Sequence, residues 1–225
     1  MAAFFVTGSG TDIGKTWVSC ALLRHWRLQG LEPQAIKPVA TGYDPDHPED
    51  SDGAALLKAL GRPADAEHVE AITPFRFRAP LSPDQAARRE GGWLSARGTA
   101  MACFAVTASA RGPVLVEGAG GVMTPLNESE TMLDLAVALH LPVIFVCGSY
   151  LGAISHALTG LAALAGRGIR SPLVLVNETQ DSTVDLHETV ATLAAHAPEA
   201  AILAIPRGAD GPVWGEASRL LGVGA

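Results

Sequence analysis

Residues 3–18 read Ala3-Phe-Phe-Val-Thr-Gly-Ser-Gly-Thr-Asp-Ile-Gly-Lys-Thr-Trp-Val18, a short apolar run followed by a glycine-rich turn. The turn closes on Gly14-Lys15-Thr16 and leads into a helical pattern. Backbone N–H groups in such a turn, together with the following helix N-terminus, converge on an anion. The lysine adds a charge, and the threonine hydroxyl is suited to a magnesium ion. The stretch therefore predicts a strand, a phosphate-binding loop and a helix that together bind a nucleoside triphosphate.

The loop is a variant of the common phosphate-loop pattern. That pattern has a glycine five residues before the glycine of Gly-Lys-Thr, and this chain has Ser9 there, between Gly8 and Gly10. A chance match in a glycine-rich chain is the alternative. The strand before the loop and the helix after it favour a nucleotide site.

Composition favours one compact α/β domain over residues 1–225, with 48% hydrophobic and 17% charged residues. The net charge of −7 argues against nucleic acid or an anionic membrane as partner, and favours small molecules. The cysteines, Cys20, Cys103 and Cys147, have no ligand-like spacing and are expected to be buried thiols. We therefore expect a reducing, cytoplasmic compartment.

Apolar β-type runs alternate with helical patterns along the chain. We expect strands at Ala3–Thr7, Pro33–Lys37, Pro113–Glu117, Pro142–Cys147, Pro172–Asn177 and Ile202–Pro206. We expect helices at Lys15–Leu28, Asp52–Leu60, Leu94–Ala110, Thr131–His140, Ala153–Arg167 and Val184–Ala195. This order predicts a single-domain fold of the P-loop NTPase type, with a mainly parallel sheet and helices on both faces. Residues 41–90, rich in proline, are expected to form a long irregular excursion at the active site.

Polar side chains fall where the expected strands end, which is where ligands collect on such sheets. Lys37 ends the second strand, and Glu117 follows four apolar residues at the end of the third. A carboxylate there is costly to bury without a cation, and magnesium suits oxygen ligands. Asp52 is a second candidate carboxylate, although it also fits a helix N-terminus. For Lys37 taken alone, a solvated lysine at a strand end is the favoured interpretation over one that points at the phosphate loop.

Two further features at these strand ends are open to two interpretations. The segment Gly118–Gly121 offers backbone N–H groups to an anion, or is a plain tight turn. Asn177, at the end of the fifth strand, has an amide suited to an adenine edge, or is a turn former.

Taken together, the motifs resemble those of the dethiobiotin synthetases, over nearly the whole chain. They are the loop Gly8–Thr16, Lys37-Pro-Val-Ala-Thr-Gly42, Ser51-Asp52, Pro80-Leu-Ser-Pro83, Glu117-Gly-Ala-Gly-Gly121, Leu151-Gly-Ala-Ile-Ser-His156 and Asn177. The resemblance implies that 7,8-diaminopelargonate, CO2 and ATP are converted to dethiobiotin, ADP and phosphate. It implies a carbamate on one substrate amine and then a carbamic–phosphoric anhydride, which the second amine attacks to close the ring.

The resemblance also implies a role for each candidate residue. Catalysis involves Lys15, Lys37 and Thr11, and magnesium binds Thr16, Asp52 and Glu117. The nucleotide contacts Gly10, Thr11, Asp12, Ile13, Gly14, Lys15, Thr16, Val18, Glu117, Asn177, Pro206, Arg207 and Gly208. The substrate contacts Thr41, Gly118, Gly121, Tyr150, Gly152 and Ser155, the last three across a homodimer interface.

The sequence departs from the family pattern near the expected substrate tail. Ser155 stands at a position where the family has asparagine. Thr189 or a neighbour occupies the position of a family tyrosine, and Glu178 occupies a position where aspartate is more usual.

Two alternatives belong to other classes of protein. A nucleotide-dependent switch or partitioning ATPase usually has a second lysine early in the loop, where this chain has Ser9 and Gly10. A corrinoid-amidating synthetase is longer, with an added glutamine-using domain.

Overall fold

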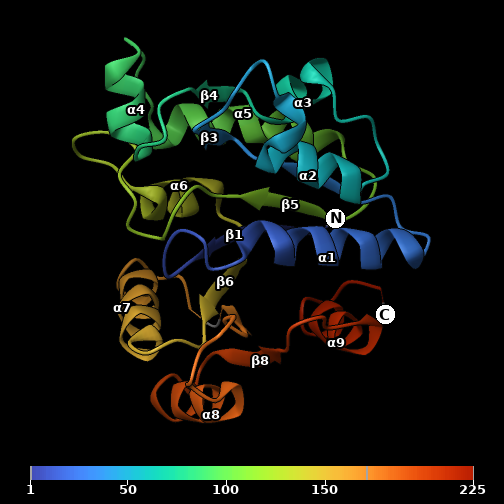
Figure 1. Cartoon of the computed structure of the whole chain (residues 1–225), viewed down its shortest axis with the longest axis vertical. Helices are drawn as coiled ribbons and strands as arrows, with labels where there is room; N and C mark the ends of the chain where they lie inside the picture. Colours follow the sequence, from blue (N-terminus) through green and yellow to red (C-terminus); the bar gives the residue numbers. More distant parts are fainter. Residues whose placement is uncertain (1, 171, 225) are drawn as a thin grey trace.

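The centre of the molecule is a six-stranded parallel sheet with strand order β2-β5-β1-β6-β7-β8 (Figure 1). The computed structural model describes residues 2–170 and 172–224. The strands of the sheet are β1 (Ala3–Gly8), β2 (Gln34–Ile36), β5 (Val114–Glu117), β6 (Val143–Gly148), β7 (Leu173–Asn177) and β8 (Ala201–Ile205). Val6 of β1 lies in register with Glu117 of β5 on one side and with Ile144 of β6 on the other. The predicted parallel sheet is confirmed.

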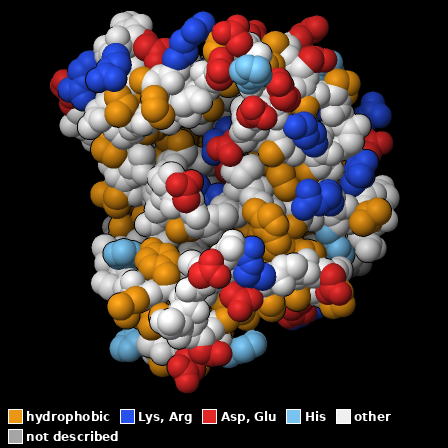
Figure 2. Space-filling view, viewed as in Figure 1, with side chains coloured by type: hydrophobic (Ala, Val, Ile, Leu, Met, Phe, Trp, Pro, Cys, Tyr) orange, Lys and Arg blue, Asp and Glu red, His pale blue; other side chains and the backbone are white. Residues whose placement is uncertain are grey.

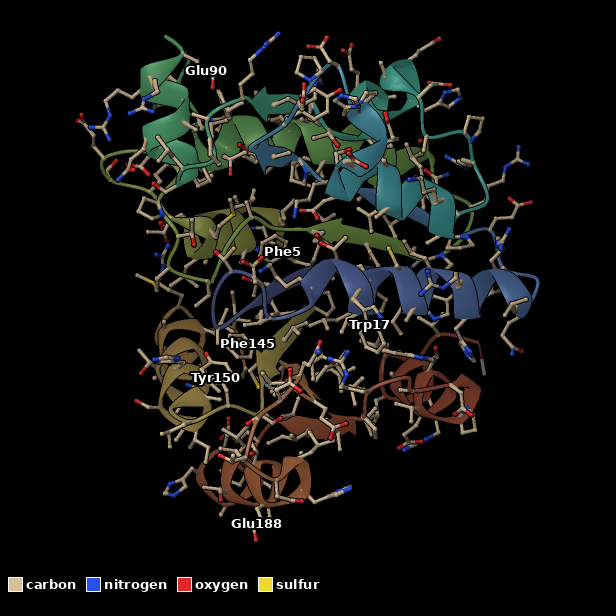
Figure 3. The ribbon with its side chains drawn as sticks, viewed as in Figure 1. Phe5, Trp17, Glu90, Phe145, Tyr150 and Glu188 are labelled. Carbon is tan, nitrogen blue, oxygen red and sulfur yellow. The ribbon has the colours of Figure 1, made fainter. Side chains whose placement is uncertain are left out.

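Helices cover both faces of the sheet, as the sequence predicts. The helices are α1 (Lys15–Leu28), α2 (Asp52–Ala59), α3 (Ala66–Ile72), α4 (Pro83–Arg89), α5 (Ala96–Ser109), α6 (Met132–Leu139), α7 (Ala153–Gly166), α8 (Leu186–His196) and α9 (Gly211–Leu220). Successive side chains of a strand point to opposite faces, so Phe4 and Val6 enter the core under α1, α2, α3 and α9. Phe5 packs in the other core, with Phe145 and with α4–α8 (Figure 3).

The stretch from residue 41 to residue 90 is more regular than expected. It holds the short 3-10 helix η1 (Pro48–Asp50), helices α2, α3 and α4, and strand β4 (Phe75–Phe77). β4 pairs in parallel with β3 (Val39–Thr41) to form a second, two-stranded sheet. Two of the prolines begin helices rather than break structure, because a proline in the first turn has no hydrogen bond to lose. Helix α9 was not expected either.

Cys20, Cys103 and Cys147 are buried, as expected. Burial raises the pKa of Cys20 to about 11, and raises the pKa of Cys103 and of Cys147 to about 12. These thiols are therefore un-ionised at neutral pH. Within residues 2–170 and 172–224, no helix is long and apolar enough to cross a bilayer.

Candidate functional site

The glycine-rich turn forms a closed loop between β1 and α1. Its entry is fixed by the Ser9 N–H, which donates to the Val146 carbonyl at 3.0 Å. Asp12 and Gly14 have φ values of 56° and 90°, so the chain passes twice through the left-handed region. Lys15 lies beneath the loop and its ammonium donates to the Gly10 carbonyl at 2.6 Å. The loop therefore wraps around the lysine, as in a phosphate-binding loop.

Next to the loop lies an ionic cluster formed by Thr16, Lys37, Asp52 and Glu117, which come from α1, the end of β2, α2 and β5. The Lys37 ammonium is 2.8 Å from Glu117 Oε1 and 2.8 Å from Asp52 Oδ2. The Thr16 hydroxyl donates to Glu117 Oε1 at 2.7 Å and also lies 3.0 Å from Asp52 Oδ1. The structure thus brings together the four polar residues that the sequence placed at separate strand and helix ends.

The ionic cluster determines the pKa values of the buried lysines Lys37 and Lys15. Glu117 is fully buried and Lys37 is 4% exposed, so each charge depends on the other. Burial alone lowers the pKa of Lys37, but Glu117 and Asp52 outweigh it and hold that pKa above its usual value. The pKa of Asp52 is lowered, because Lys37 outweighs the opposing effect of burial. For Lys15, burial and repulsion from Lys37 lower the pKa to about 8.

The donor set of the cluster fits a magnesium ion. Side-chain oxygen atoms of Thr16, Asp52 and Glu117 lie close to one another. Oxygen is the ligand type that magnesium prefers. The second carboxylate oxygen of Glu117, Oε2, is buried and accepts no hydrogen bond from the described residues. A buried carboxylate oxygen without a donor is costly, and a cation would satisfy it.

A cavity of about 670 Å³ opens beside the cluster, lined by Lys37 and Asp52, by Thr11 and Thr41, and by the Pro80–Pro83 segment. A second cavity of about 440 Å³ is lined by Ser9, Gly10, Thr11, Gly121 and His156, among others. Figure 2 shows the surface hollowed between the two halves of this face, with basic side chains inside the hollow. Thr11 borders both cavities, so the phosphate loop separates them.

The segment Gly118–Gly121, after β5, was open to two interpretations, N–H groups offered to an anion or a plain tight turn. The N–H groups of Gly118 and Gly121 themselves are both engaged within the protein. The Gly118 N–H donates to the Val6 carbonyl at 2.9 Å, and the Gly121 N–H donates to the Thr124 hydroxyl at 2.8 Å. The segment contributes instead the Gly118 carbonyl, which accepts from Lys37 at 3.2 Å.

On the other side of the α1 N-terminus lies a small cavity of about 150 Å³, lined by Trp17, Asn177, Glu178, Arg207 and Gly208. The Asn177 side-chain amide donates to the Ile13 carbonyl at 3.2 Å and so links β7 to the loop. The expected nucleotide residues of β7 and of the segment after β8 are therefore adjacent to the loop. Val18 was also expected to contact the nucleotide, but its side chain is fully buried in the core.

The remaining expected substrate residues lie apart from the 670 Å³ cavity. Tyr150, Gly152 and Ser155 occupy the turn between β6 and α7 and the first turn of α7. The Tyr150 hydroxyl pairs with His156 Nδ1 at 2.8 Å, and Ser155 is exposed. The described residues of one chain therefore do not bring this corner to Lys37.

Trp17, Thr124 and His156 were given no role on the basis of the sequence. Thr124 and His156 lie outside the quoted loop, and only folding brings them to its side. The exposed position of Trp17 could have been inferred from the helical pattern of the sequence. It lies on the exposed face of α1 with Arg24 and Leu28, where a large aromatic residue has no core to enter.

We predict that Gly14→Ala lowers the free energy of unfolding by about 1–2 kcal/mol. The φ of 90° disfavours any residue with a Cβ, and that Cβ would clash with the Asn177 amide nitrogen, which must then leave Ile13. Urea denaturation measures the loss. Gly10→Ala is the matched control, since its Cβ meets no atom within 4 Å among the described residues, and it should change stability by less than about 0.5 kcal/mol. Equal stability of the two variants would contradict the prediction.

Comparison with known structures shows the fold. Over the whole chain, the structure resembles the MinC:MinD cell division protein complex of Aquifex aeolicus, with a TM-score of 0.59 at 14% sequence identity and 98% of that chain covered. It also resembles the hydrogenase maturation factor HypB of Archaeoglobus fulgidus, with a TM-score of 0.59 at 12% identity, covering 98% of this chain and 90% of that one. At these identities the likeness concerns the P-loop NTPase fold alone.

Sequence comparison shows the family. A family model described as an AAA domain matches residues 2–210. The ATP-dependent dethiobiotin synthetase BioD of Caulobacter vibrioides (strain NA1000 / CB15N) is 48% identical over 208 residues, which are 92% of this chain and 93% of that protein. The protein of the same name in Phenylobacterium zucineum (strain HLK1) is 46% identical over 209 residues, which are 92% and 89% of the two chains. With a phosphate loop, a buried ionic cluster and relatives that match along nearly its full length, the chain belongs to the ATP-dependent dethiobiotin synthetase family.

Proposed function

We propose that this protein is a ligase that closes the ureido ring of dethiobiotin from 7,8-diaminopelargonate and CO2, with ATP converted to ADP and phosphate. Family membership gives the reaction. The observation in this structure that carries the proposal is the convergence of two buried lysines, Lys15 under the loop and Lys37 beside the cavity, from different elements. Lys15 serves the nucleotide phosphates, and transfer of the γ-phosphoryl group to a second anion calls for a further cation on the acceptor side, which Lys37 supplies.

The chemistry proceeds in three balanced steps. One amine of the substrate adds to CO2 and loses a proton, giving a carbamate. A carbamate oxygen then attacks the γ-phosphorus of ATP, and ADP leaves as the carbamic–phosphoric anhydride forms. The second amine attacks the carbamoyl carbon and loses a proton, and phosphate leaves as the ring closes. The middle step brings two anions together, so its main demand is charge neutralisation and alignment.

The residues of the site divide this task. Lys15 and the loop residues Gly10–Thr16 hold the β- and γ-phosphates, while Lys37 faces the carbamate and the transferring phosphoryl group. Thr11 and Thr41 line the same cavity and give hydroxyl groups for hydrogen bonds. Thr16, Asp52 and Glu117 would hold magnesium, which supplies charge neutralisation at the phosphates. Asn177 and residues 206–208 receive the adenine.

The distinguishing prediction concerns Lys37. Lys37→Gln deletes the charge that neutralises the carbamate, so we expect diaminopelargonate-dependent ADP formation to fall by about 100-fold or more. ATP affinity should change little, because Lys15 and the loop remain. Bicarbonate should stimulate the parent protein and barely affect the variant. Parental turnover of Lys37→Gln with diaminopelargonate and bicarbonate would refute the mechanism, and Lys58→Gln, an exposed lysine of α2, is the control.

A second prediction concerns the metal. Glu117→Gln keeps an oxygen for Lys37 but loses the carboxylate charge, so we expect an intact fold, loss of most turnover and weaker nucleotide binding only when magnesium is present. Calorimetric titration of ADP with magnesium and with EDTA measures this, and circular dichroism checks the fold. The assignment fails if magnesium has no effect on nucleotide affinity in either protein.

We propose further that the active protein is a homodimer in which Tyr150, Gly152 and Ser155 complete the partner's substrate site. Their corner is exposed and carries Leu151, an apolar side chain that is 91% exposed. Association with a second chain at this corner would remove the Leu151 side chain from water. The N-terminus of α7 lies in the same corner and suits a substrate carboxylate.

Sedimentation equilibrium at working enzyme concentration should therefore give a dimer. Leu151→Asp places a charge in the proposed interface, so we expect this variant to sediment as a monomer with little ligase activity and retained ATP binding. Leu28→Asp is the matched control, because Leu28 is an equally apolar side chain, 80% exposed, at the far end of α1. A fully active monomer would rule out the shared site.

A further inference from the structure

The Trp17 indole lies at the surface beside the proposed nucleotide site rather than in the core. Thr16, its neighbour in the chain, faces the ionic cluster, and Trp17 lies one residue further round the first turn of α1. Figure 3 shows Trp17 between α1 and the segment that contains β8 and α9. Its side chain is 37% exposed, so one part of a large aromatic surface is open to solvent or to a ligand.

The orientation of Trp17 is fixed by a second tryptophan. The rings of Trp17 and Trp214 meet edge to face, with centroids 5.5 Å apart and an interplanar angle of 64°. Trp214 is 4% exposed, and its indole N–H donates to the Ala209 carbonyl at 3.1 Å. Because Trp214 is anchored in α9, it supports Trp17 from one side, and edge-to-face pairs of this kind are favourable.

The Trp17 indole lines the 150 Å³ cavity together with polar residues of β7, of the segment that follows it, and of the β8–α9 loop. Asn177 gives its amide N–H to Ile13, which leaves its carbonyl oxygen as an acceptor. Glu178 accepts the backbone N–H of Arg207 at 2.8 Å and so fixes the far wall. An aromatic face beside an acceptor oxygen matches a planar heterocycle that carries an exocyclic amino group.

We propose that Trp17 is a positioning residue that stacks on the purine base of the nucleotide and supplies a large part of the affinity for the nucleoside. This inference rests on the proposed nucleotide site and adds a contact to it. The stack is remote from the γ-phosphate and is the same in the ground state and the transition state. It therefore lowers the KM for ATP and leaves kcat unchanged.

Two ligands separate the base contact from the phosphate contacts, namely ADP and inorganic tripolyphosphate, each titrated calorimetrically with magnesium. Trp17→Leu removes the stacking free energy between the base and the indole, so we expect it to weaken ADP binding by about 10-fold or more. Trp17→Phe keeps an aromatic face and should retain most of the affinity. Tripolyphosphate should bind all three proteins equally. In turnover assays, Trp17→Leu should raise the KM for ATP with kcat maintained.

Trp93→Leu is the matched control, since Trp93 is 72% exposed and lines a different cavity, next to α4 and α5. ADP should quench tryptophan fluorescence in the parent and in Trp93→Leu, and the quenching should be lost in Trp17→Leu. Parental ADP affinity in Trp17→Leu overturns the proposal, and so does an equal loss of ADP and tripolyphosphate binding, which would reflect a disturbed loop. A parent protein that binds neither ligand would refute the proposed function itself.

Discussion

The buried pairing of Lys37 with Glu117 is the interaction on which the site depends. Glu117 is fully buried at the end of β5, and an isolated carboxylate there would carry a large desolvation cost. Lys37, at the end of the neighbouring strand β2, offsets that cost, and the Glu117 carboxylate in turn keeps the lysine charged. Asp52 and Thr16 complete the cluster from α2 and α1, so the cluster connects the sheet edge to these two helices.

This coupling explains the layout of the molecule around the nucleotide. The ionic cluster with its larger cavity, the phosphate loop and the small cavity beside Trp17 lie in that order along the carboxyl edge of the sheet. The segment from residue 41 to residue 90 adds the second sheet, which holds Thr41 over the larger cavity. Under the proposed mechanism, a phosphate group at the loop would therefore have its acceptor on one side and its base on the other.

Much of the fold and of the site could be predicted from the sequence because its signals are local. Buried parallel strands are continuous apolar runs, and the phosphate loop is one contiguous segment. Asp52 and Glu117 could be named as candidates because each begins or ends an element at one edge of the sheet, whereas Lys37 was singled out by the family resemblance. The short helices α3 and α4 and strand β4 were missed, since their stability comes from packing rather than from a long periodic pattern.

Contacts between segments that are distant in the chain could not be predicted from the sequence. The N–H groups of Gly118 and Gly121 looked free in the sequence, yet Val6 and Thr124 accept them in the folded chain. The contact of Trp17 with Trp214 joins residues at opposite ends of the chain, and no spacing rule connects them.

The central position of β1 has a consequence for how the protein responds to its ligand. β1 is hydrogen-bonded to β5 on one side and to β6 on the other, so the loop that follows it is tied to the middle of the sheet. Detaching the loop requires opening the sheet itself, because no sheet edge lies beside it. A ligand held by the loop is then linked to global unfolding rather than to local fraying, and its binding free energy adds to the stability of the whole domain. A nucleotide held at the loop would therefore stabilise the whole fold, in addition to its part in the chemistry.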